Sequence, residues 1–331
     1  MGRKQKLRRE RKIKNKNATP PAVVTTAPEA TVEATVEATV EATVEATVEA
    51  TTEGRLLEET ARMNEIDSVF PKSDEYVQAT VGALFINGGN FKLDNVERYA
   101  LLKQGATEHG CVHSMLIMGG GQCNPMYKHL AHPWFLEGAI RGSFRCIMSL
   151  IGECYRDQAE PNRNADTLYG YWGNISISAD TRQNPKDKNV FKHRVERTCI
   201  ICSKTDTKTF TLKQCIGCSF YCYCSETCQA THWKEHNHRG ECKQLRILNK
   251  YHKPYAKAIR DAAIRGDKEI PSLEKLRYKL GLTRPLKDYQ ELITYNTHDG
   301  KLIDPKDYIV AREDGTVWVG SFPSSSPIGT S

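Results

Sequence analysis

The amino-acid sequence predicts a mainly α-helical protein with a small Cys- and His-rich module, a small α+β C-terminal segment and a disordered N-terminus. Three observations lead to this prediction. Residues 76–181 carry apolar residues at helical spacing with a weak internal repeat. Eight of the 12 cysteines lie between Cys199 and Cys242. The first 75 residues consist of a basic run followed by a low-complexity acidic segment.

The positive charge of the chain is concentrated at its N-terminus. The formal net charge is +7, but residues 1–17 hold nine of the 47 basic residues against one acid, and the rest of the chain is neutral. We expect a basic disordered tail over 1–17, either merely solvated or serving as a nuclear-import or RNA-binding patch. Residues 18–75 are predicted to be an acidic linker, in which TVEA occurs five times between Thr31 and Ala50.

No stretch of the sequence approaches the roughly 20 apolar residues that span a bilayer, and the N-terminus lacks the apolar core of a secretory signal. We therefore expect a soluble, intracellular protein without a membrane partner. The basic N-terminus favours the nucleus slightly over the cytoplasm. In such a chain, clustered cysteines indicate metal binding before disulfides.

Residues 76–181 contain a weak internal repeat with the length of a helix-turn-helix unit. Gly105 and Ala106 recur as Gly138 and Ala139, 33 residues later. Small residues inside apolar helical patterns allow two helices to pack closely, so we expect stacked helical units. The pattern resembles Sel-like repeats, relatives of the tetratricopeptide family, over about 100 residues. Four dispersed cysteines are expected to be small buried apolar side chains: Cys111, Cys123, Cys146 and Cys154.

The Cys- and His-rich module has the spacing of metal ligands. Cys199-x2-Cys202 and Cys215-x2-Cys218 are two metal knuckles, since each pair of thiolates can share one ion. Cys224 and Cys228 then lie four apart, on one face of a helix, and are followed by a cluster of histidines and Cys242. A module of this size has little core, so metal binding must supply much of its stability.

In this order of ligands, and most specifically in YCSETCQATHW, residues 199–242 resemble a MYND-type zinc finger. The resemblance implies two structural zinc ions bound in interleaved fashion. The first would take Cys199, Cys202, Cys224 and Cys228, and the second Cys215, Cys218, a histidine and Cys242. Cys222 occupies a position where the family pattern has no ligand, so we expect a spare thiol there.

The histidine ligand departs from the family pattern, which has one histidine three residues after the tryptophan and four before the last cysteine. Here His236 has the first spacing from Trp233, and His238 has the second from Cys242. Residues four apart lie on one helical face, which favours His238 and leaves His236 as the alternative. His232 is expected to pack or to face solvent.

The finger is expected to recognise protein. Protein fills all eight ligand positions, which indicates structural and not catalytic zinc. Its five Lys or Arg, four Asp or Glu, seven thiolates and two Zn²⁺ sum to a charge of about −2, which disfavours phosphate binding. The MYND resemblance implies binding of short proline-containing peptides, with Gln229 and Trp233 lining the groove. Trp233 could instead pack internally.

Two further segments complete the sequence-based prediction. Residues 255–282 predict two short helices with breaks at Gly266 and Pro271, and residues 307–320 predict a hairpin that buries Trp318. Both belong to a C-terminal region, residues 243–331. Basic runs flank the finger at Arg182–Arg197 and Lys243–Arg260, and a solvated helix face is favoured there over an RNA contact.

Together these features predict a non-enzymatic protein–protein interaction adaptor. The first alternative is a nuclear or RNA/DNA-associated factor that uses the basic tail. A methyltransferase is considered because some MYND proteins carry a SET domain, but no SET-like motif is visible on either side of the finger.

Overall fold

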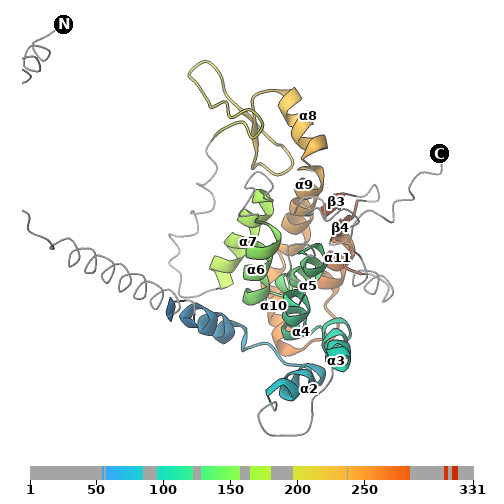
Figure 1. Cartoon of the computed structure of the whole chain (residues 1–331). Coiled ribbons are helices and arrows are strands. Elements are labelled where there is room, and N and C mark those ends of the chain that lie inside the picture. The colour runs from blue at the N-terminus through green and yellow to red at the C-terminus, as the bar shows by residue number, and fades with distance from the viewer. Residues whose placement is uncertain are drawn as a thin grey trace, which may run out of the picture. The chain divides into compact units, whose positions relative to one another are not determined.

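The computed structural model describes residues 54–55, 57–84, 95–121, 128–156, 165–179, 197–236, 238–283, 309–311 and 315–319 (Figure 1). The basic tail 1–17, most of the acidic linker 18–75, Cys123 and the basic run 182–196 lie outside these residues, so predictions for them stay predictions. The chain divides into two units, Met1–Glu58 and Glu59–Ser331. The described residues from 59 onward belong to the second unit.

The described part of this unit is mainly helical, as the sequence predicts. Residues 59–67 are helical. The helices that follow upstream of the finger are α2 (Asp74–Leu84), α3 (Asn95–Thr107), α4 (Val112–Gly120), α5 (Lys128–Ile140), α6 (Phe144–Ser149), the π-helical turn η3 (Leu150–Cys154) and α7 (Asp166–Ala179). None of the described helices is both long and apolar enough to cross a bilayer.

The internal repeat in the sequence corresponds to two helix-turn-helix units with the same close packing. A Cβ on Gly105 of α3 would lie 2.7 Å from Ser114 Oγ of α4, and a Cβ on Gly138 of α5 would lie 2.3 Å from Cys146 Sγ of α6. The turns are also alike, because Gly110 and Gly142 both adopt positive φ angles, 63° and 86°. Each unit therefore depends on two glycines. Gly105 or Gly138 lets the two helices approach closely, and Gly110 or Gly142 allows the turn between them.

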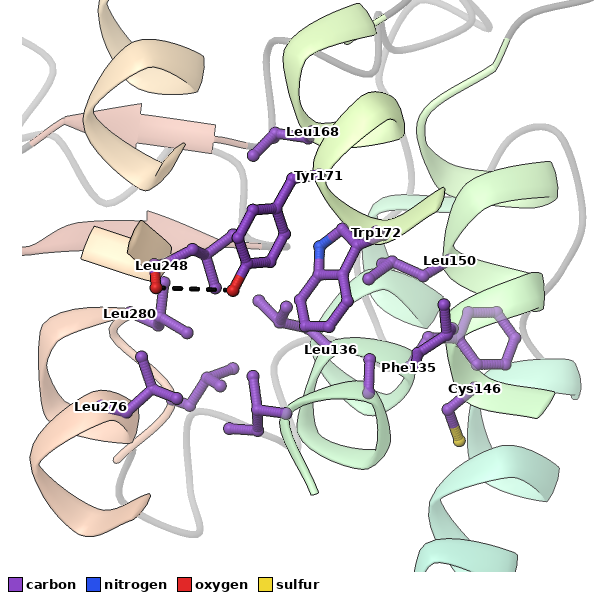
Figure 2. Close-up of a cluster of buried hydrophobic side chains, with 14 of the residues drawn as sticks. Phe135, Leu136, Cys146, Leu150, Leu168, Tyr171, Trp172, Leu248, Leu276 and Leu280 are labelled. Carbon is purple, nitrogen blue, oxygen red and sulfur yellow. Dashed lines mark hydrogen bonds between the residues drawn. The ribbon is translucent and has the colours of Figure 1, made fainter. Parts of the chain in front are cut away.

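The largest core cluster is centred on α7. Trp172 is fully buried and packs among side chains from the upstream helices, including Leu136 and Leu150, and from the helices after the finger (Figure 2). The neighbouring Tyr171 donates a hydrogen bond to the Leu248 carbonyl, with 3.4 Å between the oxygens. Helices on both sides of the finger in sequence therefore share one core. Cys111, Cys146 and Cys154 are buried, as the sequence predicts.

Two buried polar contacts join distant segments of this core. The Glu137 carboxylate pairs with Arg141, which directly follows the end of the same helix, and accepts a 2.9 Å bond from Arg277 Nε. Burial raises the pKa of Glu137, but these two guanidinium groups outweigh it and hold that pKa below its ordinary value. Asp67 accepts hydrogen bonds from Ser143 Oγ at 2.7 Å and from the Phe144 amide at 2.7 Å, and so caps the N-terminus of α6.

The segments after the finger follow the predicted breaks. The π-helical turn η6 (Leu248–His252) continues from the finger helices and leads to α10 (Ala256–Arg265) and α11 (Pro271–Lys279). Gly266 ends α10 in a left-handed conformation, and Pro271 opens α11.

The predicted hairpin is confirmed. Strand β3 (Ile309–Ala311) pairs antiparallel with β4 (Val317–Val319), with Ile309 opposite Val319. The pair lies against α5 and against the second finger helix α9 (His238–Ile247). The side chain of Trp318 lies outside the described residues, so its burial stays a prediction.

Candidate metal centre

The two knuckles have the same local fold. In each, the serine after the second cysteine adopts a positive φ angle, 58° at Ser203 and 53° at Ser219. The amide of each serine donates to the carbonyl of the first cysteine, at 2.8 Å to Cys199 and 2.7 Å to Cys215. This tight turn brings the two thiols of each Cys-x2-Cys pair to the same side of the chain. The short strands β1 (Lys213–Gln214) and β2 (Cys222–Tyr223) pair antiparallel and link the knuckles to the helices.

The first helix of the finger, α8 (Glu226–Glu235), fixes the third pair of cysteines. Ser225 is its N-cap, and its hydroxyl oxygen accepts a hydrogen bond from the Cys228 amide at 3.2 Å. The cap holds Cys228 in the first turn and Cys224 just before it. The two Sγ atoms lie 3.4 Å apart.

The structure brings the eight sequence-predicted ligands into two separate clusters, each with its ligand atoms within 4.8 Å of one another. The first cluster consists of Cys199, Cys202, Cys224 and Cys228, and the second of Cys215, Cys218, His238 and Cys242. Each cluster combines one knuckle with residues from later helices. The clusters therefore alternate along the chain, so each tethers both halves of the finger.

The spacing of the donor atoms suits zinc. Four sulfur ligands at about 2.3 Å from a tetrahedral ion lie about 3.8 Å apart. Here Cys202 Sγ is 3.3 Å from Cys224 Sγ, Cys215 Sγ is 4.0 Å from Cys242 Sγ, and Cys218 Sγ is 3.7 Å from His238 Nε2. Four thiols in the first cluster, and three thiols with one imidazole in the second, are donor sets of structural zinc sites. With all four positions supplied by protein, a bound ion would cross-link the chain.

Each cluster contains a group whose pKa is shifted toward its charged form. Burial raises the pKa of the Cys199 thiol, but backbone amides of Cys224, Cys202 and Ile201 outweigh it and lower that pKa to about 6. Burial lowers the pKa of His238, yet its hydrogen bonds to Cys215, Cys218 and Glu241 raise it to about 11. The second cluster thus stabilises positive charge at the His238 ring, and a divalent ion can supply that charge in place of the proton.

The structure separates the remaining candidates from the clusters. His238, not His236, faces the thiols, with Nε2 3.4 Å from Cys215 Sγ, while His236 is exposed at the end of α8. His232 is buried, lies 2.8 Å from the Tyr223 hydroxyl through Nδ1, and stacks on His238. Cys222 is buried in β2 outside both clusters.

Glu241 is a functional residue that the sequence did not reveal. It is fully buried, and its Oε2 lies 3.4 Å from His238 Nδ1. It also accepts hydrogen bonds from the Tyr221 hydroxyl at 3.0 Å, the Thr167 hydroxyl at 2.7 Å and the Thr167 amide at 2.9 Å. A carboxylate on the outer nitrogen of a histidine orients the ring and leaves Nε2 for the metal. Because Thr167 belongs to α7, this carboxylate also ties the second cluster to the helical core.

The outer surface of the second knuckle exposes two apolar side chains beside a hollow. Ile216 is 97% exposed and Trp233 is 36% exposed. Together with Gln229 and Arg246 they border a hollow of about 310 Å³, which we name the finger groove. Gln229 and Trp233, which the sequence predicted to contact a partner, therefore lie on one recess.

Two interleaved four-ligand clusters with no open ligand position define a structural two-zinc finger. Residues 199–242 match the family model described as MYND finger. MYND fingers are zinc-binding modules that generally mediate protein–protein interactions. No curated protein and no solved structure matches the chain. The match covers the finger alone, so the Sel-like resemblance of the upstream helices stays a prediction.

Proposed function

We propose that this protein is a non-enzymatic adaptor whose finger groove binds a proline-containing segment of a partner protein. The observation that carries the proposal is the exposed apolar surface beside the second cluster, where Ile216 is 97% and Trp233 36% exposed. A small domain stabilised by metal has few apolar side chains, and two of them left in water at a hollow indicate a contact surface.

The chemistry of the groove suits an extended proline-containing peptide. A polyproline II segment has no internal hydrogen bonds, so its carbonyls are free to accept and its rings can pack on an aromatic surface. The Trp233 indole offers that surface, and the half-buried Gln229 amide beside it offers a donor. Neither role requires chemistry at the metal, which supports an adaptor and not an enzyme.

A peptide-selection experiment tests the proposal. A random peptide library is selected on the full-length, zinc-loaded protein and on the Trp233→Ala and Tyr278→Ala variants. Tyr278 is the matched control because it is an aromatic side chain on α11, is 55% exposed and does not line the finger groove. We expect proline-containing peptides to be enriched on the wild type and on Tyr278→Ala, and to be lost on Trp233→Ala.

The zinc content of each variant separates lost recognition from lost folding. All three proteins should hold two zinc ions per chain, since neither substituted residue is a ligand. If Trp233→Ala selected the same peptides as the wild type, the finger groove would not be the recognition surface.

A further inference from the structure

Four basic side chains form a stripe along α9 and the first turn of η6. They are Arg239, Lys243, Arg246 and Lys250, and we name them the basic stripe. Their spacings of four, three and four residues place them on one face of a helix. Arg239, Arg246 and Lys250 are exposed, and Lys243 is half-buried.

The opposite face of the same helix packs against the core and the second cluster. Leu245 and Leu248 pack in the core cluster around Trp172. The sole acidic residue of α9 and η6, Glu241, is buried against His238, Tyr221 and Thr167. Glu241 therefore does not lie on the surface that carries the basic stripe.

The basic stripe borders a hollow of about 400 Å³ and does not lie on a convex surface. The indole of Trp233 and the ring of Tyr251 also line it, and among the described residues that line it there is no acid. Lys250 Nζ lies 5.2 Å from the centre of the Tyr251 ring, and Lys275 Nζ of α11 lies 5.5 Å from it. Both ammonium groups therefore lie beside a ring that lines the hollow.

This basic hollow is continuous with the finger groove. Trp233, Cys242 and Arg246 line both. An extended chain that packs on Trp233 can therefore pass from the finger groove to the basic hollow within a few residues, at about 3.3 Å per residue.

We propose that the basic hollow binds carboxylate side chains of the same peptide that occupies the finger groove, so that the preferred ligand is a proline-containing segment flanked by Asp or Glu. This inference rests on the proposed function and specifies that the partner peptide is negatively charged beside its proline. Convergence of four cations and two aromatic rings on a hollow of this size suits a few side chains of one peptide.

The experiment extends the peptide selection to charge. The probe is the same random library, selected on the zinc-loaded full-length protein at low salt. The stripe variant carries Arg239→Gln and Lys250→Gln, two exposed residues of the stripe that do not line the finger groove. The control variant carries Lys204→Gln and Lys268→Gln, two exposed lysines that do not line the hollow, so both variants lose the same charge.

On the wild type and the control variant, the enriched peptides should carry Asp or Glu beside the proline. On the stripe variant, proline should stay enriched and the acids should not. One enriched peptide and its version with Gln at the acidic positions are then measured by fluorescence anisotropy. The acidic peptide should bind the stripe variant roughly tenfold more weakly, whereas the Gln peptide should bind both proteins alike. Added salt should weaken the wild-type complex more than the variant complex.

The outcomes separate the two proposals. Proline enrichment that depends on Trp233 but is without acids would overturn the charge inference and leave the proposed function intact. Acidic enrichment that survives in the stripe variant would also overturn it, because other cations would then be responsible. A library that yields no peptide, or a stripe that binds single-stranded RNA and no acidic peptide, would contradict the inference as well. Two zinc ions in every variant show that the finger is folded.

Discussion

At the scale of single residues, short spacings in the chain position the metal ligands, whereas the tertiary fold positions Glu241. A Cys-x2-Cys pair or two residues four apart fix the distance between side chains with little help from the rest of the fold. The same reasoning distinguished His238 from His236. Glu241 was not predictable, since Thr167, one of the partners that hold it, is 74 residues away in sequence. A lone acid in a helix carries no local signal of burial.

The role of Glu241 leads to a prediction for zinc affinity. Glu241→Gln keeps the shape of the side chain and removes the negative charge that faces His238 Nδ1 at 3.4 Å. Substituting a carboxylate that orients a histidine ligand costs roughly 10–100-fold in metal affinity. We expect the variant to lose one of its two zinc ions at a lower concentration of a competing chromophoric chelator.

The control for this substitution is Glu235→Gln, at the exposed end of α8. It removes the same charge from the finger without touching a ligand, so its zinc release should follow the wild type. Equal release curves for both variants would mean that Glu241 does not act on the metal through His238.

At the scale of elements, the two knuckles have the same Cys-x2-Cys spacing, but their packing differs. The position before the second cysteine is Ile201 in the first knuckle and Gly217 in the second. A Cβ on Gly217 would lie 2.4 Å from Cys242 Sγ. The knuckle motif itself therefore tolerates a side chain there, and the requirement for glycine comes from α9, which approaches from outside the motif. Spacing alone could not predict that contact.

This difference predicts an effect of one methyl group on metal stoichiometry. In Gly217→Ala the added Cβ must displace the Cys242 thiol, which breaks the second cluster and leaves the first intact. Native mass spectrometry should find one zinc ion per chain in place of two. Ile216→Ala, a change at the adjacent 97% exposed residue, should keep both ions. Two ions in Gly217→Ala would show that the knuckle relaxes around the new atom.

At the scale of the whole molecule, the finger and the helical core share α9. Its first turn carries His238 and its middle carries Cys242, while Leu245 and Ile247 pack in the core cluster that contains Trp172. The sequence placed a boundary after Cys242 because the family pattern ends there, and in the structure that point falls inside the helix. The helical class, the breaks at Gly266 and Pro271 and the hairpin follow from local patterns. The shared helix could not be predicted, since it depends on which distant segment covers its apolar face.

The shared helix predicts that zinc stabilises more than the finger. Removing both ions with a chelator frees the first turn of α9 and the Glu241 carboxylate that holds Thr167 at the start of α7. Metal binding contributes about 10–16 kcal/mol in isolated zinc fingers, more than enough to affect a packed neighbour. Hydrogen exchange measured by mass spectrometry should therefore rise on chelation in residues 199–247 and also in α7, where Tyr171 bonds to Leu248. Helix α3 contributes Leu102 and Ala106 to a different core cluster. It therefore serves as the internal control and should keep its protection from exchange. A change confined to residues 199–242 would mean that the finger is an independent appendage and that α9 keeps its place in the core without metal.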